Sequence, residues 1–288
     1  MPRTSPSVAS VLTPYLVAQI EAVRHCEASA CAGDPDAIHD MRVAARRLKS
    51  VLTAYQPAFD PATDRQMRIE LDWLAETLGH ARDHEVQRIV LLDVAAADEV
   101  DAANLAMATE AQAALAAALI SARYRVLTQE LDAFAAKPPW TAIAERSARK
   151  VLIPLLSEQF ARIEIRIAAA RRATSRVKID DRLHRVRKSV KRARYATEAA
   201  EPILTTGTSM AKDLSTTQDV LGAHNDVVVT LGNSTRWSTL GVTSLGGSAL
   251  DKLDARARSS RKEARRALRS LRELVGESQS ALDVTLRH

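Results

Sequence analysis

A short pattern that occurs twice in the chain is the strongest constraint on its fold. Residues 38–49 read IHDMRVAARRLK and residues 183–194 read LHRVRKSVKRAR. Aligning the two histidines places every basic residue of the first segment on a basic residue of the second. A second pattern, LGxxxD, follows at 78–83 and 221–226, so that 44 and 42 residues separate histidine from aspartate. Two paired motifs at nearly constant separation indicate a duplicated helical unit.

The residues around these motifs favour helix over strand. Of the 288 residues, 46 % are hydrophobic but only 3 % are aromatic, and the chain has 9 glycines and 10 prolines. Alanine, leucine, glutamate and arginine lose little on entering a helix, and alanine is frequent throughout. Apolar residues recur at helical spacing along almost the whole chain. We therefore predict an all-α fold with a sizeable core.

Prolines and glycines mark the expected ends of the helices. Pro138 and Pro139 form the clearest boundary, because a helix cannot pass two consecutive prolines. We therefore expect a first repeat unit at 1–137 and a second at 138–288. The segment 232–248 is rich in Gly, Ser and Thr and is expected to be a loop or a weak helix. The expected helices are 8–30, 35–55, 62–78, long helices between 85 and 136, and then 141–172, 181–200, 209–221 and 248–274.

Each histidine segment carries basic residues along one side of the predicted helix. The first row, with spacings of three, four and three residues, consists of His39, Arg42, Arg46 and Lys49. The second row consists of His184, Arg187, Lys188, Lys191 and Arg194. Like charges at these spacings destabilise an isolated helix. Because the cost recurs at matching positions, we infer an anionic partner, or a set of acidic side chains, that neutralises both rows.

Both rows are also expected to begin near a helix N-terminus. Asp34 and Asp180 are the candidate N-caps, so His39 and His184 would fall in the first two turns. Backbone N–H groups and the positive end of the helix dipole favour an anion there. Arginine presents a planar fork that suits phosphate oxygens, lysine adds a point charge, and histidine gains charge as the pH falls.

A third basic row lies near the C-terminus at helical spacing and includes Arg258, Arg261 and Arg265. Arg162 and Arg166 add a basic side to the first helix of the second half. If these sides face inward, they line a cavity that concentrates the field more than a flat patch does. The candidate anion-binding residues are therefore His39, Arg42, Arg46, Lys49, His184, Arg187, Lys188, Lys191, Arg194, Arg258, Arg261 and Arg265.

Structural explanations compete with some of these functional ones. A basic row on a single helix is commonly a solvated face, and only its repetition argues against that here. His39 and His184 could be hydrogen-bonded core residues. Asp83 and Asp226 are better explained as helix caps, or as partners of the arginines, than as acid–base groups.

Two further features are the glycines of the LGxxxD patterns and a pair of histidines in the first half. Gly79 and Gly222 are expected to be helix C-caps. His80 and His84 have the i, i+4 spacing that can place two imidazoles on a metal ion. A convincing third ligand is missing nearby in the sequence, and we expect no metal site.

The charge balance and the cysteines bound the cellular setting. A formal net charge of +6 and a pI of about 9.5 favour acidic partners without choosing among them. Cys26 and Cys31 are five residues apart and point to different sides of a helix, so we expect reduced thiols in a cytoplasmic protein. We identify no signal peptide and no stretch of the roughly 20 apolar residues that a membrane span requires.

The histidine segments and the LGxxxD patterns resemble those of the CHAD family, the conserved histidine α-helical domain. The segment 121–127, SARYRVL, is similar to the helix that closes the first unit in that family. The resemblance covers roughly residues 8–275. It implies two pseudo-symmetric four-helix units packed around a basic central cavity. It also implies binding of inorganic polyphosphate by the two histidine rows, and association with polyphosphate granules.

We expect this chain to be a stand-alone, non-catalytic member that needs no cofactor. Some relatives carry a triphosphatase domain, but the alternating Glu-x-Glu-x-Lys strand of that domain is missing. A phosphohydrolase would need a metal held by carboxylates or an activated nucleophile, and the rows supply neither. The alternative is a nucleic-acid-binding protein that uses the same charges. Tyr195 is the one aromatic residue among the rows, so stacking platforms for single strands are scarce.

Overall fold

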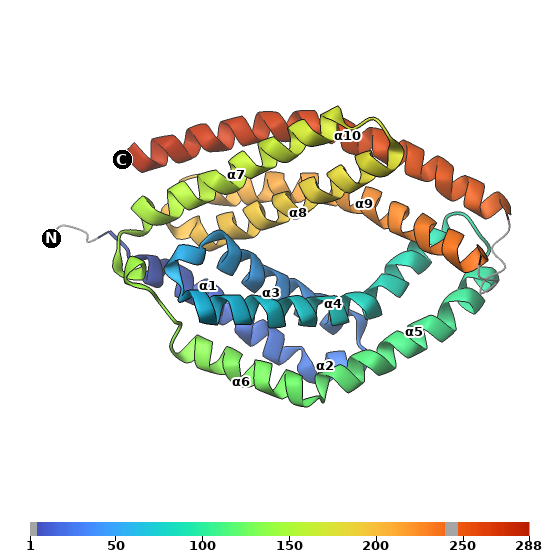
Figure 1. Cartoon of the computed structure of the whole chain (residues 1–288), viewed down its shortest axis with the longest axis horizontal. Helices are drawn as coiled ribbons and strands as arrows, with labels where there is room; N and C mark the ends of the chain where they lie inside the picture. Colours follow the sequence, from blue (N-terminus) through green and yellow to red (C-terminus); the bar gives the residue numbers. More distant parts are fainter. Residues whose placement is uncertain (1–4, 240–246, 288) are drawn as a thin grey trace.

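The computed structural model describes residues 5–239 and 247–287, and within them the chain forms α-helices and short 3-10 turns but no β-strand (Figure 1). The helices are α1 (Val8–His25), α2 (Glu27–Cys31), α3 (Pro35–Ala54), α4 (Pro61–Leu92), α5 (Ala97–Leu119), α6 (Ala122–Ala136), α7 (Ala148–Arg172), α8 (Arg176–Ala200), α9 (Gly207–Thr239) and α10 (Gly247–Arg287). The 3-10 turns are η1 (Gln56–Ala58), η2 (Ala142–Glu145) and η3 (Glu201–Ile203). The predicted all-α fold is confirmed. No helix in the described segments is long and apolar enough to cross a bilayer.

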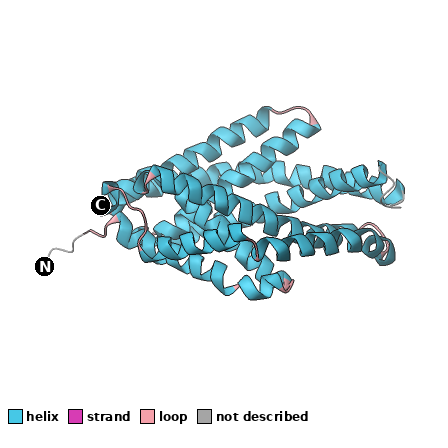
Figure 2. Cartoon of the chain, turned by 60° about the horizontal axis from the view of Figure 1, so that its bottom comes forward, coloured by secondary structure: helices cyan, strands magenta, loops and turns pink. Residues whose placement is uncertain are grey.

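The two helices that carry the histidine segments pack against each other in the middle of the molecule. In Figure 1, α1 to α6 occupy the lower part and α7 to α10 the upper part. α3 contacts α8 between them, α4 packs on α3, and α9 packs on α8. Figure 2 shows the same long bundle turned, with loops only at the ends of the helices. The expected division after residue 137 and the pseudo-symmetry of the two units stay predictions.

Two apolar clusters hold the bundle together. The larger cluster joins helices of both parts and includes the fully buried Leu16, Leu48 and Phe160. The smaller cluster ties α4 and α5 to α9 and α10 around residues such as Val90 and Leu253. Between these clusters, α4 and α9 carry mostly polar residues. The helices are therefore fixed by apolar burial on both sides of a polar space.

A buried tyrosine fixes the position of α3 on α8. The hydroxyl of Tyr55 donates a hydrogen bond to the backbone oxygen of Ala196 at 2.8 Å, and the ring is fully buried. Burial raises the pKa of Tyr55, so the hydroxyl keeps its proton and remains a donor. This contact holds the two histidine helices in one register.

Glycine is a helix interior residue in both LGxxxD patterns. Gly79 lies within α4 and Gly222 within α9, so the prediction that they are C-caps is wrong. The α4 helix therefore does not end near Leu78 but continues to Leu92. The left-handed conformation occurs instead at Gly33, with φ of 91°, just after α2 ends.

The second histidine helix begins earlier than predicted. α8 starts at Arg176, and the Ser175 side chain caps it by accepting a hydrogen bond from the backbone N–H of Lys178. Asp180 is therefore not an N-cap, and His184 lies in the third turn, beyond the reach of the helix terminus. Asp34 does cap α3 as predicted, through the N–H of Asp36.

Other boundaries also differ from the prediction. The expected helix at 8–30 is interrupted at Cys26, where α1 ends and α2 begins. α10 continues beyond 274 to Arg287. α9 continues to Thr239, which makes the first part of the expected loop at 232–248 helical, while 240–246 lie outside the described residues.

Candidate functional site

A central cavity lies among α3, α4, α8 and α9. It consists of two adjoining hollows of about 600 and 840 Å³. Both hollows are lined by Arg42, Arg46, Asp83, Lys188 and Lys191, which therefore mark the place where they meet. The first hollow extends past Lys49, Thr53, Asp72, Glu76 and Arg192. The second extends past His39, His184, Arg187, Asn225 and Asp226. Most residues of the two histidine rows are thus brought to one space.

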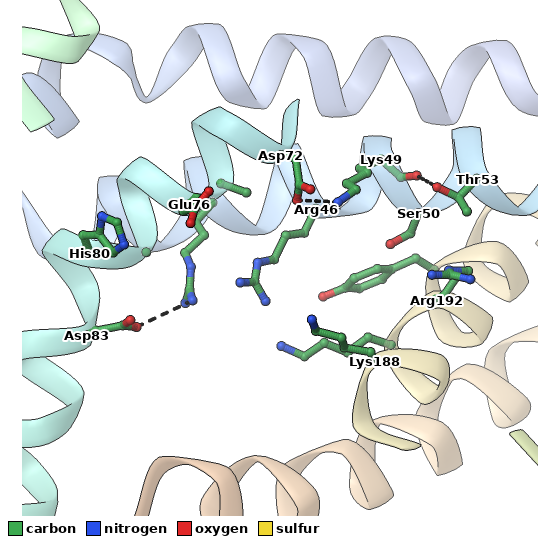
Figure 3. A pocket seen from close by; sticks show the side chains of 15 residues that line it. Arg46, Lys49, Ser50, Thr53, Asp72, Glu76, His80, Asp83, Lys188 and Arg192 are labelled. Carbon is green, nitrogen blue, oxygen red and sulfur yellow. Dashed lines mark hydrogen bonds and ion pairs between the residues drawn. The ribbon is translucent and has the colours of Figure 1, made fainter. Parts of the chain in front are cut away.

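The centre of this cavity holds cations that lack carboxylate partners. Arg46 of α3 and Arg187 and Lys191 of α8 are half-buried, and none of them forms an ion pair with any other described residue. Figure 3 shows Arg46 and Lys188 pointing into the same space from opposite helices. A half-buried charge without a partner is costly, so this cluster is poorly satisfied by the protein alone.

The cost of placing these positive charges together lowers the pKa of side chains in the cluster. Burial, reinforced by repulsion from Arg187 and Arg46, lowers the pKa of Lys191 to about 6. Burial and repulsion from Arg46 lower the pKa of Arg42 to about 10, although Asp83 opposes the shift. At neutral pH the arginines therefore stay charged, whereas Lys191 is largely neutral until an anion enters.

Each LGxxxD pattern packs its glycine against an arginine of the histidine segment. A Cβ atom at Gly79 would lie 3.5 Å from Nε of Arg42, and one at Gly222 would lie 3.8 Å from Nε of Arg187. Both Nε atoms are buried and meet no hydrogen-bond acceptor among the described residues. The same local contact thus occurs twice, and it gives the duplicated motifs a structural meaning: each LGxxxD helix packs at its glycine against an arginine of a histidine segment.

The two histidines at matching positions of the repeat differ in their surroundings. Nδ1 of His184 lies 2.6 Å from the side-chain oxygen of Asn225, which places a proton on that nitrogen. Burial lowers the pKa of His184, and the nearby Lys188 acts in the same direction. His39 is exposed at the rim of the second hollow. Neither histidine is a core residue, and both face the cavity.

Carboxylates on α4 partly neutralise the first row. Asp83 lies 3.7 Å from the guanidinium of Arg42, and Asp72 forms an ion pair with Lys49. Asp83 is therefore an arginine partner, whereas its position inside α4, and that of Asp226 inside α9, rules out the capping explanation. Among the side chains that the structure describes, no three His, Cys, Asp or Glu residues gather as a metal site would require.

One residue of the second row turns away from the cavity. Arg194 forms a hydrogen bond to Glu198 at 2.9 Å and lies over the ring of Tyr195, with its guanidinium carbon 5.6 Å from the ring centre. The same carboxylate lies 3.3 Å from Arg47 and accepts a hydrogen bond from Tyr15. Arg194 therefore belongs to a structural network between α1, α3 and α8.

The C-terminal basic row does not face the cavity either, contrary to our expectation. The apolar side of α10 packs on α7 and α9, which leaves its basic side toward solvent. Arg258 pairs with Asp254 on the same helix, and Arg265 is exposed. Of these three arginines, Arg261 reaches another helix, where it meets the carboxylate of Asp180.

A polar lock connects α8, α9 and α10 beside the second hollow. Arg261 binds Asp180 through two hydrogen bonds of 2.6 and 2.7 Å. Nε2 of the buried His224 lies 3.1 Å from Asp180, and its Nδ1 lies 2.9 Å from the hydroxyl of Ser260. Burial opposes ionisation, but the hydrogen bonds from Arg261 and His224 outweigh it and lower the pKa of Asp180. The lock fixes the wall of the cavity.

Removing Arg261 should therefore weaken the fold. We expect Arg261→Ala to lower the free energy of unfolding by about 2 kcal/mol, because a largely buried carboxylate loses two charge-assisted hydrogen bonds. Urea denaturation monitored by circular dichroism measures the change. The matched control is Arg265→Ala on the exposed side of the same helix, which should stay within about 0.5 kcal/mol of the parent. Equal stabilities of the two variants would contradict a structural role for the lock.

The structure adds lining residues that the sequence reasoning missed. Arg192 and Tyr195 of α8 and Thr53 of α3 line the first hollow. The repeat aligned Arg192 with Arg47, yet Arg47 binds Glu198 while Arg192 faces the hollow. The available signal was the lack of any acidic residue between 182 and 194, which made every basic residue of that segment a candidate.

Comparison with known proteins identifies relatives of this chain. The sequence profile described as the CHAD domain matches residues 14–232. Two Mycobacterium tuberculosis proteins, Rv2226 of strain H37Rv and MT2285 of strain CDC 1551, are each 32 % identical over 211 residues, which are 67 % of this chain. The match spans 39 % of the length of these relatives.

Two solved structures share the fold. PptA from Streptomyces chartreusis superposes with a TM-score of 0.75 at 21 % identity, covering 93 % of this chain and 99 % of that one. The crystal structure of the CHAD domain from the plant Ricinus communis superposes with a TM-score of 0.67 at 25 % identity, covering 98 % of this chain and 92 % of that one.

Proposed function

Because this chain belongs to the CHAD domain family, we propose that it binds inorganic polyphosphate in its central cavity without cleaving it. The observation that carries the proposal is the meeting of Arg42 and Arg46 from α3 with Arg187 and Lys191 from α8. Three of these four cations have no acidic partner in the described chain. An anion that enters the cavity supplies the negative charge that these side chains lack within the protein.

The shape of the cation cluster favours a linear polyanion over a single phosphate. The two hollows adjoin, and basic residues follow one another from His39 at one rim to Lys49 and Arg192 at the other. A chain with a negative charge on every unit can meet these side chains in sequence. Arginine forks and lysine ammonium groups form short charge-assisted hydrogen bonds to phosphate oxygens.

The residues around the cavity support binding rather than hydrolysis. Two of the carboxylates that line the cavity, Asp72 and Asp83, form ion pairs with Lys49 and Arg42. Carboxylates held in this way are poorly placed to activate water as general bases. Retention of polyphosphate is the direct consequence, and placement of the protein on polyphosphate granules is the cellular role that we propose.

The salt dependence of binding tests this function. We expect the logarithm of the affinity for long-chain polyphosphate to fall linearly with the logarithm of the KCl concentration. By analogy with single-stranded nucleic acid, four neutralised phosphates would give a slope of about −3. Fluorescence anisotropy with end-labelled polyphosphate measures it. A slope near zero, or no binding at low salt, would refute the proposal.

Competition separates this function from nucleic-acid binding. Tyr195, the aromatic residue that lines the first hollow, is buried, so it offers no exposed face on which a base could stack. Unlabelled polyphosphate should therefore displace the probe at lower phosphate-unit concentrations than single-stranded DNA or RNA does at the same salt. The reverse order would favour the nucleic-acid alternative.

A further inference from the structure

An unpaired arginine lies at the outer end of the first hollow. Arg192 of α8 lines this hollow together with Thr53 of α3, and its side chain is half-buried. Figure 3 places Arg192 at the same end of the hollow as Ser50 and Thr53, away from Asp83 at the other end. Within the described chain, Arg192 forms no ion pair. Like the cations of the central cluster, a half-buried and unpaired arginine would be stabilised by a bound anion.

Other arginines surround Arg192 from two neighbouring helices. α7 packs along α8 and carries Arg162 and Arg166 one turn apart, while Arg68 approaches from α4. Burial lowers the pKa of Arg192, and repulsion from Arg162, Arg166 and Arg68 lowers it further. Arg162, Arg166 and Arg68 therefore lie close enough to Arg192 to repel its guanidinium at this end of the hollow.

The carboxylates nearby leave most of this charge uncompensated. Arg68 forms an ion pair with the buried Asp64, so the charge of this carboxylate is already compensated by Arg68. Arg162 has only a loose contact of 3.6 Å with Glu158, and both side chains are more than half exposed. Such an exposed pair contributes little and opens readily. Arg166 forms no ion pair with the described residues, so Arg162 and Arg166 are available to a ligand.

We propose that the mouth of the cavity beside Arg192 continues into a second anion-binding subsite on α7, formed by Arg162, Arg166 and Arg192, which holds the part of a polyphosphate chain that emerges from the cavity. This inference rests on the proposed function and extends the ligand path onto a helix outside the central cluster. A short oligophosphate fills the centre and does not reach α7. A long chain reaches both places, so the subsite contributes to affinity only above a certain chain length.

Charge reversal on the exposed face of α7 tests the subsite. The variant Arg162→Glu/Arg166→Glu should bind long-chain polyphosphate about tenfold more weakly than the parent at low salt, with a salt slope smaller by about 1. Its affinity for tripolyphosphate should stay within about twofold of the parent. Both residues are exposed, so the substitutions should leave folding intact, which the helical circular dichroism signal monitors.

The matched control is Arg125→Glu/Arg266→Glu, which reverses two exposed charges that line neither hollow. It undergoes the same change in net charge and should keep the affinity of the parent for both probes. If the α7 variant binds long chains as well as this control does, the subsite is refuted while the proposed function stands. An equal loss for tripolyphosphate and long chains would also overturn it. If the parent protein binds neither probe, the proposed function fails together with the subsite.

Discussion

Exchanging the four central cations for glutamine is expected to abolish polyphosphate retention and, at the same time, to raise the thermal stability of the ligand-free protein. The variant is Arg42→Gln/Arg46→Gln/Arg187→Gln/Lys191→Gln. Each lost charge-assisted hydrogen bond contributes about 1.5–3 kcal/mol, so the loss of four should lower affinity by more than a hundredfold. Isothermal titration with long-chain polyphosphate measures the affinity.

The gain in stability follows from the same cluster. Arg46, Arg187 and Lys191 are half-buried beside one another without carboxylate partners in the described chain, and the pKa of each is lowered by burial and by a neighbouring cation. Glutamine keeps much of each side chain's bulk and can still donate hydrogen bonds, but it removes the repulsion. A higher melting temperature with lost binding would show that the charges serve the ligand rather than the fold. A lower melting temperature would show that they support the fold.

Two further variants make the result specific to the cavity. Glutamate at the same four positions should lose retention completely while keeping the helical signal. The control for long-range charge reverses four exposed cations elsewhere, Arg125, Lys150, Lys252 and Arg266. This control has the same net charge as the glutamate variant. If it loses retention to the same extent, the total charge of the protein governs binding and the cavity does not.

The sequence predicted the helices that build the site because its motifs are local. The cationic rows at 38–49 and 183–194 lie on α3 and α8, and these two helices do meet. The helix ends near Gly79 and Gly222 could not be predicted in the same way. A glycine can end a helix by adopting the left-handed conformation, but it can equally remain inside a helix. Tertiary packing decides between the two, and here α4 and α9 continue past their glycines.

The direction that each basic row faces could not be predicted from the sequence either. The rows on α3 and α10 both recur at helical spacing, yet one faces the cavity and the other faces solvent. Which side of a helix is buried depends on where its apolar residues find partners, and α10 packs its apolar side on α7 and α9. The prediction that Arg194 faces the cavity was wrong for a related reason. Arg194 forms an ion pair with Glu198, one turn away on the same helix, and therefore does not point into the cavity.

The affinity for polyphosphate is expected to rise as the pH falls from about 8 toward 6, because binding adds a proton to Lys191. In the empty cavity, burial and repulsion from Arg187, Arg46 and Arg42 lower the pKa of Lys191 to about 6, against the attraction of Asp226 on α9. A bound phosphate chain favours the charged form and shifts the pKa back upward. Above pH 6 the affinity should therefore fall by up to about tenfold for each pH unit.

The variant Lys191→Arg isolates this contribution. A guanidinium keeps its proton throughout this range, so the variant should lose most of the pH dependence while it still binds polyphosphate. Burial also lowers the pKa of His184, which lines the same cavity, so a smaller dependence from this histidine should persist in the variant. Binding isotherms of both proteins across this pH range provide the comparison. Parallel pH profiles would exclude Lys191 as the group that takes up the proton.

The lowered pKa of Lys191 also predicts how the stability of the ligand-free protein changes with pH. In the unfolded chain Lys191 holds its proton up to its ordinary pKa of 10.5, whereas in the folded protein it releases the proton near pH 6. The unfolded state therefore binds more protons between these values, and the contribution of Lys191 makes the folded protein more stable as the pH rises through this window. The difference in melting temperature between Lys191→Met and the parent should shrink as the pH rises from 6 to 9. A constant difference would mean that Lys191 stays protonated in the empty cavity, and the proton uptake on binding would then have no source.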